Sequence, residues 1–359
     1  MKKIRFIASA LLLLFAILPV FAQDGTSYKI TSKGVVKTVE QDDEVSQYNV
    51  IKPIMVLKSR YEVTEKGYSK FSVKNARLGV QGDVSKIFSY RFMFDFCAEN
   101  KFSVLDLYAV VKPAKRLSFT IGQQGLSLYN SWTVSPNSLD YVNRPFIGKY
   151  FISSRDIGVS MKYAIKKEGF PINAELGVYN GSGINNPTWD KSLATGGRLE
   201  FGSSKEGFRA SGKFYNQRND GYTDLYAGVD IRYENPKFKV EAEYMSKKYG
   251  ELLEGRYNPS HLGAAYVEGM LKVKTNNSTV KRVEPVLRWD AMGYDVMDRG
   301  FGVNRITAGV NVLFNTGACT TMLRLNYEQY FKSKMDMSKL FKNARDTENK
   351  LSLEYLMFF

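Results

Sequence analysis

The stretch FSYRFMFDFC, residues 88–97, indicates the fold class of this chain. Aromatic residues take every second position, and the positions between them are mostly polar or charged. The aromatic set is Phe88, Tyr90, Phe92, Phe94 and Phe96, and the other face carries Ser89, Arg91, Asp95 and Cys97. Successive side chains of a β-strand point to opposite faces of a sheet. We therefore predict a strand with one apolar face and one charged face.

The same period of two recurs from residue 51 to the end of the chain. NRITAGVNVLF (304–314) and LRLNYEQY (323–330) repeat it clearly. We predict sixteen strands, at 53–63, 70–84, 87–98, 103–112, 117–126, 156–166, 172–180, 195–203, 208–217, 224–235, 237–248, 261–274, 280–291, 304–315, 320–331 and 348–359. An even strand number is typical of a single-chain bacterial outer-membrane barrel.

Short and long connections alternate between these strands. The short ones include SK (85–86), AKR (114–116), TNNST (275–279) and TGACT (316–320), and the long ones include 127–155, 181–193, 250–260, 293–303 and 333–348. Short periplasmic turns that alternate with longer extracellular loops are the barrel pattern. We predict an all-β, 16-stranded antiparallel transmembrane β-barrel over residues 51–359. Several β-sandwich domains would explain the alternation within strands, but they do not predict this order of loop lengths.

The first 22 residues, MKKIRFIASALLLLFAILPVFA, have a basic start, an apolar run and small residues before a cleavage site. We predict a secretory signal peptide at 1–22; an uncleaved anchor is the alternative, although a spanning helix needs about 20 apolar residues. Its loss removes Lys2, Lys3 and Arg5, so the net charge falls from +15 to 15 − 3 = +12. A basic, exported chain favours anionic solutes or lipid headgroups over nucleic acid as partners. Residues 23–50 are polar, with an acidic cluster at 40–44, and we expect a periplasmic lead-in there, with a segment near the lumen mouth as the alternative.

The chain ends on LSLEYLMFF (351–359), an apolar run that would be an aggregation hazard if it were unpaired. As the last strand of a closed barrel it has neighbours on both sides. Residues Leu351, Leu353, Tyr355, Met357 and Phe359 would then face lipid, and Ser352 and Glu354 would face the lumen. The terminal Phe359 also resembles the signal that the outer-membrane assembly machinery recognises.

The longest connection, residues 127–155, is too long for a simple connector and is the third extracellular loop of the predicted barrel. In general porins the third loop folds into the lumen and narrows it, and we predict the same here. The loop carries Arg144, Lys149 and Arg155 with Asp140 as its acidic residue. Basic groups at a constriction lower the barrier for anions. The alternative is that these charges lie on the outside of the loop, either solvated or paired with acidic neighbours.

Strand periodicity also places basic residues on the inward, pore-lining faces. We expect Lys58, Arg60, Arg77, Arg91, Lys162, Arg198, Arg305 and Arg324 there, together with Arg209, Lys213, Arg232, Arg282 and Arg288. Acidic residues share these faces: Asp95, Asp106, Glu175, Glu200, Asp230, Glu241, Glu284 and Glu328. Much of this charge should pair across neighbouring strands, with a modest positive excess left over.

An outer-membrane barrel enzyme is the rival function. The single histidine, His261, follows Ser260, and a hydrolase of this kind needs a histidine base oriented by a third group. One histidine at a loop-to-strand junction is more often incidental, so we predict no enzyme, no metal site and no cofactor. Cys97 and Cys319 fall at opposite ends of the predicted barrel wall, too far apart for a disulfide. We expect two free thiols.

Several stretches, in their order along the chain, resemble the phosphate-selective porin O and P family. They include ARLGVQGDV (76–84), LDLYAVVKPAKRLSFTIGQ (105–123), RDIGVSMKY (155–163), GVYNGSGINN (177–186) and VEPVLRWD (283–290). The resemblance implies a 16-stranded, usually trimeric barrel whose basic lumen passes anions such as phosphate. It also carries Arg144, Lys149 and Arg155 over as solute-binding positions. Family members commonly have a basic residue and a Pro-Phe pair after Gly122-Gln123, where this chain has Gln124-Gly125-Leu126.

We therefore predict an outer-membrane porin that passes small hydrophilic solutes with a preference for anions, phosphate among them. The expected partners are small anionic solutes, outer-membrane lipid, the assembly machinery and two further copies in a homotrimer. A non-selective diffusion porin is the alternative within the class, and a barrel enzyme or adhesin is the alternative outside it.

Overall fold

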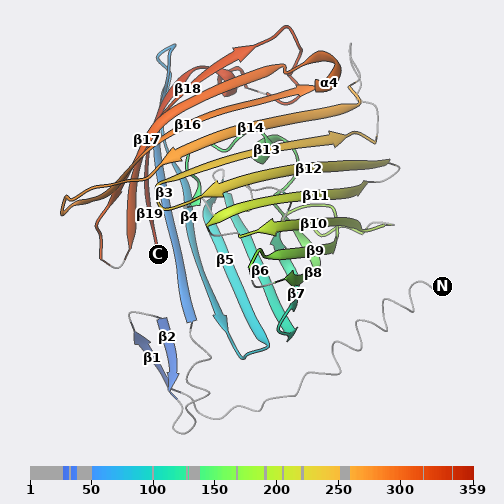
Figure 1. Ribbon diagram of the computed structural model, residues 1–359, viewed down its shortest axis with the longest axis vertical. Coiled ribbons are helices and arrows are strands. Elements are labelled where there is room, and N and C mark those ends of the chain that lie inside the picture. Colours follow the sequence, from blue (N-terminus) through green and yellow to red (C-terminus); the bar gives the residue numbers. More distant parts are fainter. Residues whose placement is uncertain are drawn as a thin grey trace.

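The computed structural model describes residues 27–31, 34–38, 51–98, 101–126, 128, 138–166, 169–189, 192–203, 206–219, 222–250, 259–317, 319–341 and 343–359. Within them the strands of residues 51–359 form a closed antiparallel barrel (Figure 1). The strands are β3 (Ile51–Thr64), β4 (Ser69–Asp83), β5 (Phe88–Ala98), β6 (Lys101–Ala114), β7 (Leu117–Gly125), β8 (Arg155–Lys166), β9 (Ile172–Tyr179), β10 (Ala194–Gly202), β11 (Gly207–Asn219), β12 (Tyr222–Glu234), β13 (Phe238–Lys248), β14 (His261–Leu271), β15 (Val273–Lys274), β16 (Val280–Tyr294), β17 (Val303–Phe314), β18 (Thr320–Lys332) and β19 (Lys350–Phe358).

The predicted 16-stranded antiparallel barrel is confirmed. β14 and β15 both pair with β16 and act as one strand interrupted at Lys272, so the wall has sixteen strands. The ends of the sixteen predicted strands lie within three residues of the observed ones. β19 closes the barrel because it pairs with β18 on one side and with β3, from Lys350↔Thr64 to Phe358↔Val56, on the other.

The two faces of the wall differ as the alternation predicts. Along β19, Leu351, Leu353 and Tyr355 are 42%, 43% and 39% exposed on the outer face, whereas Ser352 and Glu354 are fully buried on the inner face. Leu356 is an exception, since it lies on the inner face and packs in a small apolar cluster with Val56, Leu313 and Met322. An outer face of apolar side chains is what a barrel wall in lipid requires.

The connections divide into two kinds. At one end of the barrel, here called the short-turn end, lie turns such as 84–87, 115–116 and 235–237. At the other, the long-loop end, lie the described parts of the connections 126–154, 180–193, 249–260, 295–302 and 333–349. They hold the short helices α3 (Ile147–Tyr150), α4 (Val296–Arg299) and η2 (Ala344–Thr347). Over the described residues, no helix has the length and apolar character to cross a membrane.

The chain before the barrel is described only in part. β1 (Ser27–Thr31) and β2 (Gly34–Thr38) form an antiparallel hairpin near the point where β3 begins (Figure 1). Val35 of this hairpin pairs with Ile51. The predicted signal peptide at 1–22 and the acidic cluster at 40–44 lie outside the described residues.

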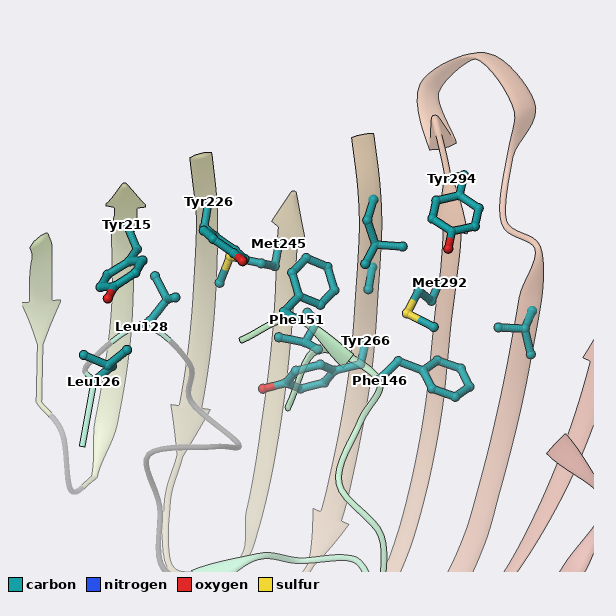
Figure 2. Close-up of a cluster of buried hydrophobic side chains, with 14 of the residues drawn as sticks. Leu126, Leu128, Phe146, Phe151, Tyr215, Tyr226, Met245, Tyr266, Met292 and Tyr294 are labelled. Atoms are coloured by element: carbon teal, nitrogen blue, oxygen red, sulfur yellow. The ribbon is translucent and has the colours of Figure 1, made fainter. Parts of the chain in front are cut away.

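A hydrophobic cluster fills part of the interior toward the long-loop end. Figure 2 shows that Leu126, Leu128, Phe146 and Phe151, from the connection between β7 and β8, face side chains carried by strands of the wall. The strand side chains include Tyr215, Tyr226, Met245, Tyr266 and Met292, all buried. Met335, Leu340 and Phe341, from the connection between β18 and β19, pack on the same cluster. Part of the third loop is thus packed as a core.

Candidate functional site

The described part of the third loop, hereafter the 138–154 segment, is bonded to the inner face of the wall. The Val142 amide donates to Oδ1 of Asn326 at 2.7 Å, and the Phe146 amide donates to Oδ2 of Asp290 at 3.1 Å. The Tyr141 hydroxyl donates to the Gly269 carbonyl at 3.0 Å. These partners lie on β18, β16 and β14. Since residues 127 and 129–137 are outside the described residues, an inward path for the whole of 127–155 stays a prediction.

Arg144 lies in this segment beside three other arginines, Arg77, Arg155 and Arg60, and one carboxylate, that of Glu354. Burial, followed by the repulsion of Arg77, Arg155 and Arg60, lowers the pKa of Arg144 to about 10. The guanidinium therefore remains charged at neutral pH. Like charges gathered at one place are unfavourable for the protein alone and become favourable when an anion shares them.

This positive region extends to the part of the wall formed by β4 to β8. Arg77 pairs with Asp95 at 2.9 Å. Asp106 is shared, because one of its oxygens accepts from Arg91 at 2.9 Å and the other from Arg155 at 2.7 Å. Arg77, Arg91 and Arg155 therefore share the carboxylates of Asp95 and Asp106, and the charges of Arg77 and Arg155 act on Arg144. We call this set, Arg77, Arg91, Arg144 and Arg155, the arginine group.

Most of the other predicted pore-lining cations are occupied by ion pairs. Glu354 binds Lys58 at 3.1 Å, Arg60 at 2.8 Å and Arg324 at 3.1 Å. Arg305 binds Asp290 at 2.7 Å and Glu328 at 3.0 Å, and Arg198 binds Glu200 at 3.1 Å. Except for Arg198–Glu200, which lies within β10, these are the cross-strand pairs that the sequence suggests. These residues are part of the inner wall, and each has a carboxylate within 3.1 Å.

Lys162 is exposed and lies in a second basic region, at the short-turn end. A hollow of about 550 Å³ there is lined by Lys86, Lys112, Lys115, Arg116 and Lys162, among other residues. Lys112 pairs with Asp83 at 3.5 Å. A solute that leaves the barrel past this region meets an excess of positive charge.

Lys149 is not part of the arginine group. It lies five residues further along the segment, in α3, at 54% side-chain exposure, and its Nζ is 3.9 Å from Asp346 in the connection between β18 and β19. It also stacks on the ring of Tyr150 at 4.8 Å. Of the three loop positions chosen from the sequence, the structure brings Arg144 and Arg155 together and places Lys149 apart from them.

Sequence reasoning missed the residues that hold the loop. Tyr141, Asn143 and Asn326 make several of its bonds to the wall, and no motif marks them. The only available signal was weak: Asn326 takes an inward position in LRLNYEQY. A loop path depends on contacts between distant segments, which periodicity does not encode.

Ser260, His261 and Asp295 lie close together at the long-loop end. Ser260 Oγ is 2.7 Å from His261 Nδ1 and donates to Asp295 Oδ1 at 2.9 Å, and His261 Nδ1 is 3.7 Å from that same oxygen. In a hydrolase triad the imidazole separates the two, with one ring nitrogen on the serine and the other on the acid. Here both contact the same nitrogen, and Asp295 also accepts the backbone amides of Ser260 and His261. The arrangement is that of a loop cap. The two cysteines, Cys97 and Cys319, are free thiols.

Comparison with known proteins identifies the barrel type. The sequence matches no protein-family model and no curated protein. Solved structures do match. *Salmonella typhi* OmpF in complex with daunomycin shares 13% identity over 87% of this chain and 98% of that one, with a TM-score of 0.63. The outer membrane channel DcaP of *Acinetobacter baumannii* shares 10% identity over 86% and 97%, with a TM-score of 0.57.

An anion-selective porin from *Comamonas acidovorans* also shares 10% identity, over 86% of this chain and 98% of that one, with a TM-score of 0.56. The chain therefore has the fold of the outer-membrane porins.

Proposed function

We propose that this protein is an outer-membrane porin that passes small hydrophilic solutes by diffusion and prefers anions. The observation that carries the proposal is the arginine group, in which Arg91 and Arg155 of the wall share Asp106 and the charges of Arg77 and Arg155 act on Arg144 of the loop. Arg77, Arg91 and Arg155 share the carboxylates of Asp95 and Asp106, and the charge of Arg144 adds to theirs, so we expect a net positive potential along this side of the passage. Such charge lowers the electrostatic barrier for an anion and raises it for a cation.

Two further observations support this direction. The basic hollow around Lys162 extends the positive potential to the short-turn end, which we assign to the periplasm because short turns face that side in outer-membrane barrels. One structure with the same fold is described as an anion-selective porin. Phosphate as the preferred anion, the homotrimer and recognition of Phe359 by the assembly machinery belong to the same proposal. They rest on the family resemblance and, for the trimer, on a neighbour solved in a trimer form.

The test is the reversal potential of the purified protein in planar lipid bilayers across a salt gradient. We expect the wild-type channel to favour anions and Arg144→Ala to reduce the anion-to-cation permeability ratio. A unit charge acting over about 4 Å in water contributes about 1 kcal/mol, which corresponds to about a fivefold change in that ratio. Arg218→Ala, which removes an exposed arginine of β11, is the matched control and should leave the ratio unchanged.

A reversal potential near zero in the wild-type protein would favour the non-selective diffusion porin instead. Selectivity for cations, or an unchanged ratio in Arg144→Ala, would reject the proposal. Phosphate can be tested in the same bilayers, because a site for it would reduce chloride conductance as phosphate is added.

A further inference from the structure

Three consecutive carbonyl groups of the third loop are each held by a different arginine of the wall. Arg60 of β3 donates to the Val142 carbonyl at 2.6 Å, and Arg288 of β16 donates to the Asn143 carbonyl at 3.0 Å. Arg305 of β17 donates to the Arg144 carbonyl at 2.7 Å. We call Arg60, Arg288 and Arg305 the carbonyl clamp. The backbone at 142–144 is thus bonded to three different strands of the wall.

The clamp arginines are not available to a passing solute. Arg60, Arg288 and Arg305 are only 7%, 1% and 3% exposed. Carboxylates also bind two of them closely: Arg60 binds Glu354 through Nε and Nη2, at 3.2 and 2.8 Å, and Arg305 binds Asp290 through the same two atoms, at 2.9 and 2.7 Å. Arg288 lies 3.6 Å from Asp290 and 3.7 Å from Glu268.

Aromatic rings of the loop cover two of the guanidinium groups. The ring centroid of Tyr141 lies 4.4 Å from Cζ of Arg288, and that of Phe146 lies 4.7 Å from Cζ of Arg305. The loop therefore contacts these arginines through both its backbone carbonyls and its aromatic side chains. A cation that is covered, paired with an acid and bonded to a carbonyl positions the loop and attracts no free anion.

The chemistry of the contact requires arginine. A guanidinium has five donors in a fixed plane, so it can bind a carboxylate with one edge and a carbonyl with another. A lysine ammonium keeps the charge and the ion pair but lacks the planar fork. A substitution of arginine by lysine therefore keeps the positive charge and removes the geometry that holds the loop carbonyl, so it tests positioning alone.

We propose that Arg60, Arg288 and Arg305 are positioning residues: they fix the backbone at 142–144 and thereby keep the side chain of Arg144 near Arg77 and Arg155. The inference rests on the proposed function, in which Arg144 sets the anion preference. It adds that the preference depends on wall residues that never contact the solute. It also changes the role of Arg60 and Arg305, which the sequence suggests as pore-lining charges.

The test compares Arg305→Lys and Arg288→Lys with wild type in the bilayer assay. We expect the anion-to-cation permeability ratio to fall toward that of Arg144→Ala, by up to about fivefold, although the total charge is unchanged. The matched control is Arg209→Lys. Arg209 is also a buried inward arginine, and it pairs with Asp230 at 3.4 Å and Glu241 at 3.7 Å on other strands. We expect no change in that variant.

A double-mutant cycle gives the sharper result. In an Arg144→Ala background, Arg305→Lys should cause no further loss of selectivity, because the side chain that it positions is already gone. If the lysine variants keep wild-type selectivity while Arg144→Ala loses it, the clamp inference is wrong and the proposed function stands. If Arg144→Ala has no effect, the proposed function fails.

A second measurement follows the loop itself. With Cys97 and Cys319 replaced by alanine, the rate at which a charged thiol reagent modifies an Arg144→Cys variant reports where this position lies. We expect Arg305→Lys to change that rate several-fold, and an unchanged rate would overturn the clamp.

If a lysine variant fails to give the heat-modifiable band of a folded barrel, Asn143→Ala replaces it. That variant removes the bonds to Arg60 and Glu328, at 2.7 and 3.0 Å, and leaves every wall charge in place. It should lower the permeability ratio in the same direction, and an unchanged ratio would count against the clamp.

Discussion

Glu354→Gln should weaken the barrel where it closes. Glu354 is fully buried. It lies in β19, the last strand, which closes the barrel by pairing with both β18 and the first strand, β3. It faces Arg60 of β3 on one side and Arg324 of β18 on the other, and its carboxylate also binds Lys58 at 3.1 Å. Glutamine keeps the size of the side chain and removes its charge.

The expected cost is large because three buried cations lose their shared partner. Breaking one buried ion pair by removing one partner costs about 3–5 kcal/mol, since the other charge stays buried and uncompensated. Arg60 retains a contact with Glu62 at 3.5 Å, which offsets part of the loss. We therefore expect the free energy of unfolding to fall by about 3–5 kcal/mol. Glu348→Gln is the control, because its partner Lys66 is 70% exposed at 3.2 Å and such surface pairs contribute about 0–1 kcal/mol.

The assay is urea unfolding of the protein refolded into lipid vesicles. The fluorescence of Trp289, which lies on the outer face of β16, and the heat-modifiable band on a gel both report the folded barrel. If Glu354→Gln unfolds at the same urea concentration as Glu348→Gln, the three pairs do not stabilise the closure and the reasoning is wrong.

Three other variants test single contacts. Arg144→His should give a channel whose anion preference appears only in acid, since neighbouring cations lower the pKa of an imidazole there below about 6.5, and reversal potentials from pH 5 to 8 measure it. Selectivity that is flat over this range would argue against the arginine neighbourhood. Lys149→Ala should leave selectivity within error of wild type because Lys149 pairs with Asp346, so a loss as large as that of Arg144→Ala contradicts its placement. Gly122→Ala should destabilise the barrel by about 1–3 kcal/mol in urea unfolding, because Gly122 has a φ of 123° and a Cβ would meet the Leu107 carbonyl oxygen. Wild-type stability would rule out that strain.

The strands were predictable and the loop contacts were not. A strand such as that at 88–97 can be predicted from its own residues alone, because Phe92 and Phe94 alternate with Arg91 and Asp95 within a few positions. Once each strand is known, the loop lengths decide how the strands connect. Closure by 351–359 then follows from the need to pair both edges of the last strand.

The candidate site could be predicted only as a set of charges. Inward positions for Arg60, Arg77 and Arg305 follow from parity, but their different roles depend on which of them the loop reaches. Leu356 shows the same limit, since its inward position is clear from its neighbours while its apolar partners come from three other strands. Long-range contacts of this kind become visible only in the folded chain.

The bonds that attach the third loop divide the wall of the barrel into two parts, and these parts differ in how well they tolerate substitutions. If the carbonyl clamp positions the loop as proposed, the wall that carries it is a mount, and a substitution there shifts residues 142–144. The β4–β8 wall carries Arg77, Arg91 and Arg155, which no clamp bond requires. A nanopore engineer who wants a new analyte specificity should therefore redesign these positions alone and leave the mount intact. The same division gives natural variants a route to a new solute at little cost in folding.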